Sequence, residues 1–144
     1  MDDTKDTKLS LQYIACAQRE ILEDFALFNG DKELMWCYLV DLGRRLPALS
    51  MGERIRENLV TKCLSRVWLV REVRGGRLWL RADSESSITK GLVSLLVRVF
   101  SGQLVEAVAK ANFFLLPSVS QLVGVQRSSG FYEMWGVVQH FVRV

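Results

Sequence analysis

The chain has 144 residues, of which 49% are hydrophobic and 24% are charged, values typical of one globular domain. Its 19 basic residues are spread among 16 acidic ones, with no basic run longer than Arg44-Arg45, which argues against a dedicated nucleic-acid-binding protein. No apolar stretch reaches the roughly 18 residues of a membrane span, and the polar, acidic start MDDTKDTK does not resemble a signal peptide.

The first third of the chain predicts two helices followed by a loop. Apolar residues recur at helical spacing over Leu9–Phe28, and Gly30 lies just beyond as a stop signal. Asp31 can cap a second helix that runs to about Leu42. Residues 49–62 have no clean period and predict a loop with a short extended piece.

A β-hairpin is predicted next. Residues 66–73 are rich in β-branched and aromatic types, and residues 77–82 alternate strictly between polar and apolar. Gly75-Gly76 between them indicates a two-residue turn, because both central positions of such a turn can require positive φ. The core-facing side, which Arg71 interrupts, is expected to carry Val67, Leu69, Val73, Leu78, Leu80 and Ala82.

The rest of the chain predicts helices. Asp83-Ser84 offers an N-terminal cap, after which apolar residues recur at helical spacing until Ser101-Gly102. Further helices are expected at 104–111, at about 113–123 and at 129–143.

This order of elements predicts the α+β class, with a small curved antiparallel sheet packed against helices. Residues 1–8 are expected to form a flexible N-terminal tail, and residues 9–144 a single domain.

The three cysteines differ in their predicted surroundings. They cannot all pair, so we expect free thiols in a cytoplasmic setting. Cys16 and Cys37 lie in helical runs among apolar neighbours and are expected to be buried and inert. Cys63 lies in the predicted loop beside Lys62 and three residues before Arg66, and nearby cations lower a thiol pKa below its free value of about 8.5. Cys63 is therefore the candidate nucleophile, with an ordinary cysteine beside a lysine as the alternative.

Other chemistry has little support in the sequence. The lone His140, near the end of the last predicted helix, has no second ligand residue at the spacing that a metal site needs. No phosphate loop, dinucleotide fingerprint or nucleophile elbow occurs. We expect no metal site and no cofactor bound by the chain itself.

Four segments, in this order and spacing, resemble the SufE (cysteine desulfuration) family. Family members carry a helix that ends in LG-x-x-LP, then N-x-V-x-GCQS-x-VW, then DSD before a KGL helix, and a late SR-x-x-G. The corresponding segments here are WCYLVDLGRRLPAL (36–49), ENLVTKCLSRVWLV (57–70), ADSESSITKGLVSLL (82–96) and VQRSSGFYEM (125–134). The resemblance covers roughly residues 20–143.

The resemblance implies a fold similar to SufE and to IscU-type scaffold proteins, and a role as a sulfur carrier. The family's acceptor cysteine matches Cys63. It would take persulfide sulfur from a SufS-type cysteine desulfurase, which carries pyridoxal phosphate, and stimulate that enzyme. The sulfur would pass to a SufBCD-type scaffold for iron–sulfur cluster assembly. Such a chain is an accessory sulfurtransferase rather than a stand-alone enzyme; monomer and homodimer both remain open.

The chain departs from the family pattern around Cys63. Lys62 and Leu64 replace the family glycine and glutamine, which changes the conformational freedom and the surface of the loop. The residues expected to support the site or contact a partner are Lys62, Arg66, Asp83, Glu85 and Arg127.

A persulfide carrier must also shield its sulfur from water and oxidants. We expect an apolar pocket with Leu64, Val67 and Trp68 as walls. Such a pocket opposes the thiolate by desolvation, so partner docking would have to expose the loop. The alternative function is a module that binds the desulfurase and regulates it without transferring sulfur.

Overall fold

The computed structural model describes residues 3–143, which form helices around one β-hairpin. The first two residues of the predicted tail and residue 144 of the predicted domain lie outside the described residues. The elements in chain order are α1 (Asp3–Ala26), α2 (Lys32–Arg44), the 3₁₀ turns η1 (Met51–Glu53) and η2 (Arg56–Asn58), β1 (Val67–Arg74), β2 (Arg77–Ser84), α3 (Ser87–Phe100), α4 (Val105–Lys110), α5 (Leu115–Val123) and α6 (Val125–Arg143).

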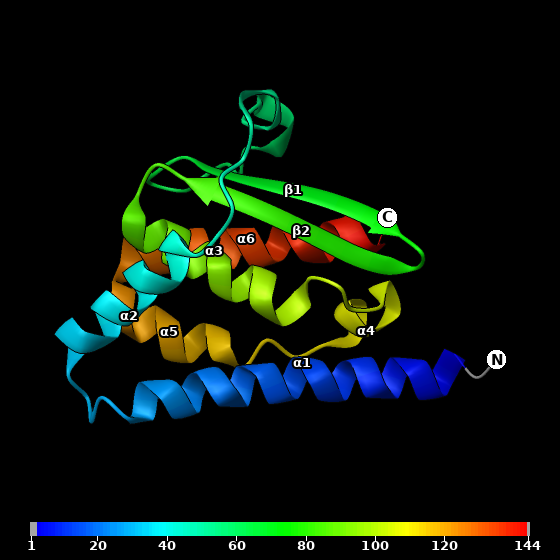
Figure 1. Ribbon diagram of the computed structural model, residues 1–144, viewed down its shortest axis with the longest axis horizontal. Helices are drawn as coiled ribbons and strands as arrows, with labels where there is room; N and C mark the ends of the chain where they lie inside the picture. The colour runs from blue at the N-terminus through cyan, green and yellow to red at the C-terminus, as the bar shows by residue number, and fades with distance from the viewer. Residues whose placement is uncertain (1–2, 144) are drawn as a thin grey trace.

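The elements lie in layers, with α3 near the centre. In Figure 1 the hairpin lies over α3 and α6, and α1 runs along the opposite side of the molecule. Ten of the 14 residues of α3 are buried, which explains why its sequence is apolar on nearly every face. The fold is therefore α+β, as predicted.

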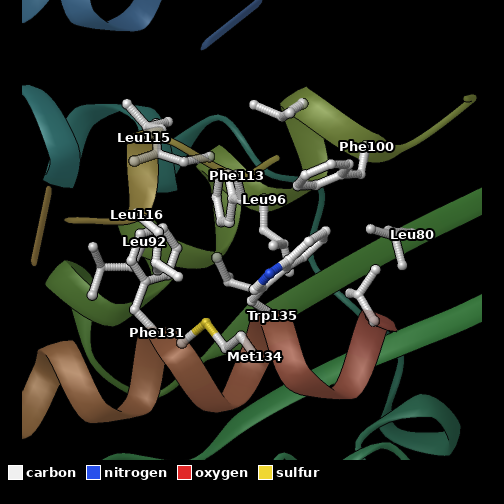
Figure 2. Packing of buried hydrophobic residues seen from close by; sticks show 14 of the residues in the cluster. Leu80, Leu92, Leu96, Phe100, Phe113, Leu115, Leu116, Phe131, Met134 and Trp135 are labelled. Carbon is white, nitrogen blue, oxygen red and sulfur yellow. The ribbon is translucent and has the colours of Figure 1, made fainter. Parts of the chain in front are cut away.

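An aromatic cluster joins α3 to α6. Figure 2 shows Trp135 and Met134 of α6 among the buried side chains of the core. The rings of Phe100 and Trp135 are stacked with centroids 4.6 Å apart, and Phe113 meets Phe131 edge-on at 5.6 Å. Such pairs stabilise a core by about 0.5–1.5 kcal/mol beyond the burial of their area. The cluster gives α6 a rigid position under the hairpin.

The predicted hairpin is confirmed. Gly75 and Gly76 have φ of +61° and +75°, and the antiparallel register pairs Leu69 with Ala82. Five of the six residues expected on the core face are buried, but Val73 is 50% exposed. It belongs to the end of the strand next to the exposed turn, where β1 is no longer buried.

The helix boundaries show what the tertiary structure changes. The α1 helix begins at Asp3 rather than Leu9, so residues 3–8 are helical and not a tail. Thr7 is buried and donates to Glu106 at 3.3 Å, while Ser10 donates to Gln103 at 2.8 Å. These polar side chains have partners about a hundred residues away, so local composition could not reveal the helix.

Two predicted helix starts also shift. The N-cap of α3 is Ser86, whose hydroxyl accepts from the Thr89 N–H at 3.4 Å, so Asp83-Ser84 ends β2 instead of capping the helix. The α6 helix begins at Val125, four residues before the predicted start. The predicted Asp31 cap of α2 is confirmed by its bond from the Leu34 N–H at 3.2 Å. Within residues 3–143, no helix is both long and apolar enough to span a membrane.

Candidate functional site

Cys63 lies in a short loop that is closed at its base. The Val60 N–H donates to the Val67 carbonyl at 2.8 Å, and Leu59 forms an isolated antiparallel bridge with Trp68. Residues 61–66, called here the Cys63 loop, project from this base between η2 and β1. The loop therefore leads directly into the rigid hairpin.

The residue before the cysteine takes an unusual backbone conformation. Lys62 has φ of +65°, in the left-handed region that glycine enters freely and other L-residues enter at a cost of about 1–2 kcal/mol. Lys62 therefore adopts a backbone conformation that suits glycine, the residue that the family pattern has at this position. Its own side chain is exposed.

The thiol of Cys63 packs against the backbone of α6. Its Sγ donates to the Gly130 carbonyl at 3.6 Å, a weak bond typical of a thiol. A Cβ added at Gly130 would lie 3.2 Å from this sulfur and 3.7 Å from the Cys63 Cα. The glycine therefore allows the close approach of loop and helix. It is the last residue of the late SR-x-x-G motif, so the motif contained this signal although Gly130 was not predicted as a site residue.

The electrostatics around Cys63 contradict the sequence-based expectation. Burial, and secondarily the negative charge of Glu133, raise the pKa of the thiol to about 11. The predicted lowering by Lys62 and Arg66 is wrong. Lys62 points into solvent, and the Arg66 guanidinium pairs with Glu85 at 3.6 Å. In the closed loop the thiol is therefore protonated at neutral pH.

The three residues expected to form the walls of an apolar pocket differ in their burial. Val67 and Trp68 are buried, and Cys63 packs against the hydrophobic core. Leu64 is 66% exposed and is not a wall of the pocket. It adds an apolar side chain to the outer surface of the loop.

Asp83 is a buried carboxylate that joins three parts of the chain. It accepts from the Arg54 guanidinium at 2.5 Å and pairs with the Lys90 ammonium at 3.3 Å. The N–H groups of Leu49 and Ser84 also donate to it, at 3.4 and 2.8 Å. Burial raises its pKa, but these bonds and Lys90 outweigh that effect and hold the pKa below its usual value. Asp83 therefore anchors the segment that precedes the Cys63 loop.

Arg54 is a partner of Asp83 that the sequence did not indicate. Its guanidinium lies over the Trp68 ring at 5.4 Å from the centroid, in addition to its bond with Asp83. No local motif marks this arginine, and 29 residues separate it from Asp83.

Arg66 and Glu85 support the base of the Cys63 loop rather than the thiol. The Arg66 carbonyl accepts from the Ser84 hydroxyl at 2.7 Å and from the Glu85 N–H at 3.2 Å. Together with the ion pair between their side chains, these bonds fix the last residue of the loop to the end of β2.

Arg127 lies one turn before Gly130 on α6. Its guanidinium is 5.1 Å from the centroid of the Trp36 ring on α2. The structure therefore assigns Arg127 a contact between helices, and it confirms no role of this residue at the thiol.

The other two cysteines are exposed, contrary to prediction. Cys16 and Cys37 lie on the outer faces of α1 and α2, and the Cys16 thiol is 3.7 Å from the Glu20 carboxylate. Their apolar sequence neighbours point to other sides of the helices. In residues 3–143 no group of three or more His, Cys, Asp or Glu side chains could hold a metal ion.

Comparisons with known proteins agree with this architecture. Residues 19–142 match the family model described as SufE, Fe-S metabolism associated domain. An uncharacterized SufE-like protein of Rhizobium etli is 34% identical over 122 residues, which cover 80% of this chain and 82% of the relative. Another from Rhizobium meliloti is 30% identical over 122 residues, with 80% and 86% covered.

A solved structure supports the fold independently. The solution structure of a hypothetical protein from Thermus thermophilus has a TM-score of 0.68 and 20% identity, and the alignment covers 85% of this chain and 93% of that one. At this identity the likeness concerns the fold alone. Because the family model matches residues 19–142 and a relative is 34% identical over 80% of this chain, the chain belongs to the SufE family and has a role in Fe-S metabolism.

Proposed function

We propose that this chain is a sulfur carrier that accepts persulfide sulfur from a SufS-type cysteine desulfurase onto Cys63. It stimulates the desulfurase and passes the sulfur to a SufBCD-type scaffold for cluster assembly. The observation that carries the proposal is the placement of Cys63. Its thiol is half-buried on a loop with a fixed base, whereas Cys16 and Cys37 lie exposed on helices. The three free cysteines are in keeping with a reducing compartment such as the cytoplasm.

The transfer step is an exchange at sulfur. The Cys63 thiolate attacks the terminal sulfur of the desulfurase persulfide, a new S–S bond forms, and the original S–S bond breaks. The desulfurase cysteine leaves as a thiolate, and Cys63 becomes a persulfide that retains the proton of the transferred sulfur. No external oxidant is consumed, because the sulfur moves at the same oxidation level.

The closed loop is a resting state in this scheme. With a thiol pKa of about 11, only a very small fraction of Cys63 is ionised at neutral pH. Attack therefore requires the loop to move away from α6, because only then can water solvate the thiolate. The exposed side chains of Lys62 and Leu64 flank the cysteine and are available to the docking partner.

Intact-protein mass spectrometry tests the proposal. The chain is incubated with a SufS-type desulfurase, pyridoxal phosphate and cysteine, and its mass is compared before and after reduction. We expect a gain of about 32 Da that dithiothreitol removes and that Cys63→Ser abolishes. Cys16→Ser and Cys37→Ser are matched controls, because both thiols are exposed and could react adventitiously. Both variants should retain the gain, since each keeps Cys63.

The alternative function predicts a different pattern. A regulatory binding module would form a complex with the desulfurase and change its turnover, yet gain no sulfur. Stimulation that survives Cys63→Ser, together with an unchanged mass of the wild type, would replace the carrier proposal with the module.

A further inference from the structure

The face of α6 that meets Cys63 carries a carboxylate. Gly130 packs directly on the thiol, and Glu133 lies three residues further along the same helix. Positions i and i+3 share a helix face, so Glu133 is adjacent to the contact between loop and helix. Glu133 is partly buried, and it is the one acidic residue within Val125–Arg143.

The other charged groups near Cys63 are engaged or directed elsewhere. From the loop itself, Lys62 is exposed and Arg66 pairs with Glu85. From α6, Arg127 stacks over Trp36. Burial is the largest cause of the raised pKa of Cys63, and the negative charge of Glu133 is the second. Within residues 3–143 no ion pair joins Glu133 to a cation.

We propose that Glu133 is a positioning residue that keeps Cys63 protonated, and therefore unreactive, while the loop rests against α6. The Gly130 carbonyl accepts from the S–H, and the Glu133 carboxylate disfavours a second negative charge beside it, so both groups favour the thiol. When the loop leaves the helix, Cys63 leaves both groups and its proton passes to solvent. This inference rests on the proposed carrier function, because a carrier thiol must not react with other electrophiles before its partner docks.

The test is the pH profile of Cys63 alkylation by iodoacetamide, followed by mass spectrometry. Cys16→Ser and Cys37→Ser are combined as the parent, so that Cys63 alone reacts. The parent should show a midpoint near pH 11. Glu133→Gln should lower the midpoint by roughly half to one pH unit, which makes alkylation at about pH 8 three- to tenfold faster.

Two controls separate charge from packing. Glu133→Asp keeps the charge and should stay close to the parent profile. Glu23→Gln removes an exposed carboxylate on α1, on the far side of the molecule from the hairpin in Figure 1, and should change nothing. A folded Glu133→Gln protein with an unchanged midpoint would overturn the proposal. So would equal shifts in Glu133→Gln and Glu133→Asp, since these would indicate packing rather than charge.

A further measurement needs no change at position 133. About 1 M salt partly screens a carboxylate that is only half-buried, so the midpoint of the parent should fall by a few tenths of a pH unit. A midpoint that stays constant or rises contradicts the assignment.

Sulfur loading by the desulfurase is read separately by mass. A lowered midpoint in Glu133→Gln without sulfur loading of the wild type would reject the carrier function but support the role of Glu133. Sulfur loading without a lowered midpoint in Glu133→Gln would support the carrier function and reject the role of Glu133.

Discussion

Cys63 and Lys62 are adjacent in the chain, yet their side chains have different surroundings. Lys62 extends into water from a left-handed backbone position, where its charge is screened. The Cys63 thiol turns inward to the Gly130 carbonyl and loses part of its solvation. At the residue scale, solvent exposure therefore outweighs sequence proximity in setting the reactivity of the cysteine.

The backbone of Lys62 gives a stability prediction. Lys62→Gly should increase the free energy of unfolding by about 0.5–1 kcal/mol. Glycine adopts positive φ without a Cβ clash, and the greater entropy of glycine in the unfolded chain offsets part of this gain. Urea denaturation followed by circular dichroism measures the change. Asn29→Gly is the matched control: Asn29 has φ of +50°, but asparagine tolerates this region better, so its gain should be smaller. A destabilised Lys62→Gly protein would contradict the loop conformation.

At the scale of elements, α2 and α3 meet through glycines. A Cβ on Gly43 would lie 2.7 Å from the Gly91 nitrogen, and a Cβ on Gly91 would overlap the carbonyl of Leu39. The two helix backbones therefore touch directly, and α2 in turn carries the Trp36 ring that contacts Arg127. This crossing fixes α2 against the buried centre of the fold.

Gly91→Ala should destabilise the protein strongly, by about 3 kcal/mol or more, because the added methyl meets backbone that cannot move without parting the helices. Thermal and urea unfolding measure the loss. Gly136→Ala is the control, since Gly136 lies in α6 with nothing near its Cβ position, and it should stabilise by about 0.5–1 kcal/mol. Similar effects of the two substitutions would show that α2 and α3 are not in contact at this point.

Asp83 predicts a second effect at this scale. Asp83→Asn leaves Arg54 and Lys90 without their shared anion and should lower the free energy of unfolding by about 2–4 kcal/mol. Asp41→Asn is the control; its pair with Arg45 is exposed on both sides, so the loss should stay below about 0.5 kcal/mol. Equal losses would contradict the buried network.

The contribution of Asp83 also depends on pH. Its folded-state pKa lies below that of the unfolded chain, so the stabilisation is complete above the unfolded value of about 3.9 and is lost as the pH falls through the folded value. Urea denaturation of wild type and Asp83→Asn at several pH values should show a constant difference near neutrality. The difference should shrink under acid conditions, and one that grew on acidification would contradict the lowered pKa.

At the scale of the whole molecule, α1 is attached through a buried amide. The Gln18 side chain is fully buried, donates to the Asn112 carbonyl at 3.0 Å and accepts from the Leu115 N–H at 3.0 Å. Gln18 thereby satisfies backbone groups at the start of α5, far along the chain from α1. Together with Thr7 and Ser10, it explains why α1 packs along its length.

Gln18→Ala should destabilise the protein by about 2–4 kcal/mol, because it leaves a buried carbonyl and a buried N–H without partners and opens a cavity. Urea denaturation gives the value. Gln126→Ala changes an exposed side chain in the first turn of α6 and should stay within about 0.5 kcal/mol of wild type. A small effect of Gln18→Ala would mean that water replaces the amide.

Local patterns of the sequence determined the α+β class, the hairpin with its Gly75-Gly76 turn, the Asp31 cap and the family, and the family motifs led to the prediction that Cys63 is the acceptor. Each depends on residues close in the chain, where periodicity, turn chemistry and ordered motifs act directly. Only the tertiary structure decided that α1 begins at Asp3, that Cys16 and Cys37 are exposed, that Asp83 joins Arg54 to Lys90, and that the Cys63 thiol lies against Gly130. Burial, hydrogen bonding between distant segments and pKa shifts depend on which surfaces exclude water, and that is settled only when the whole chain packs.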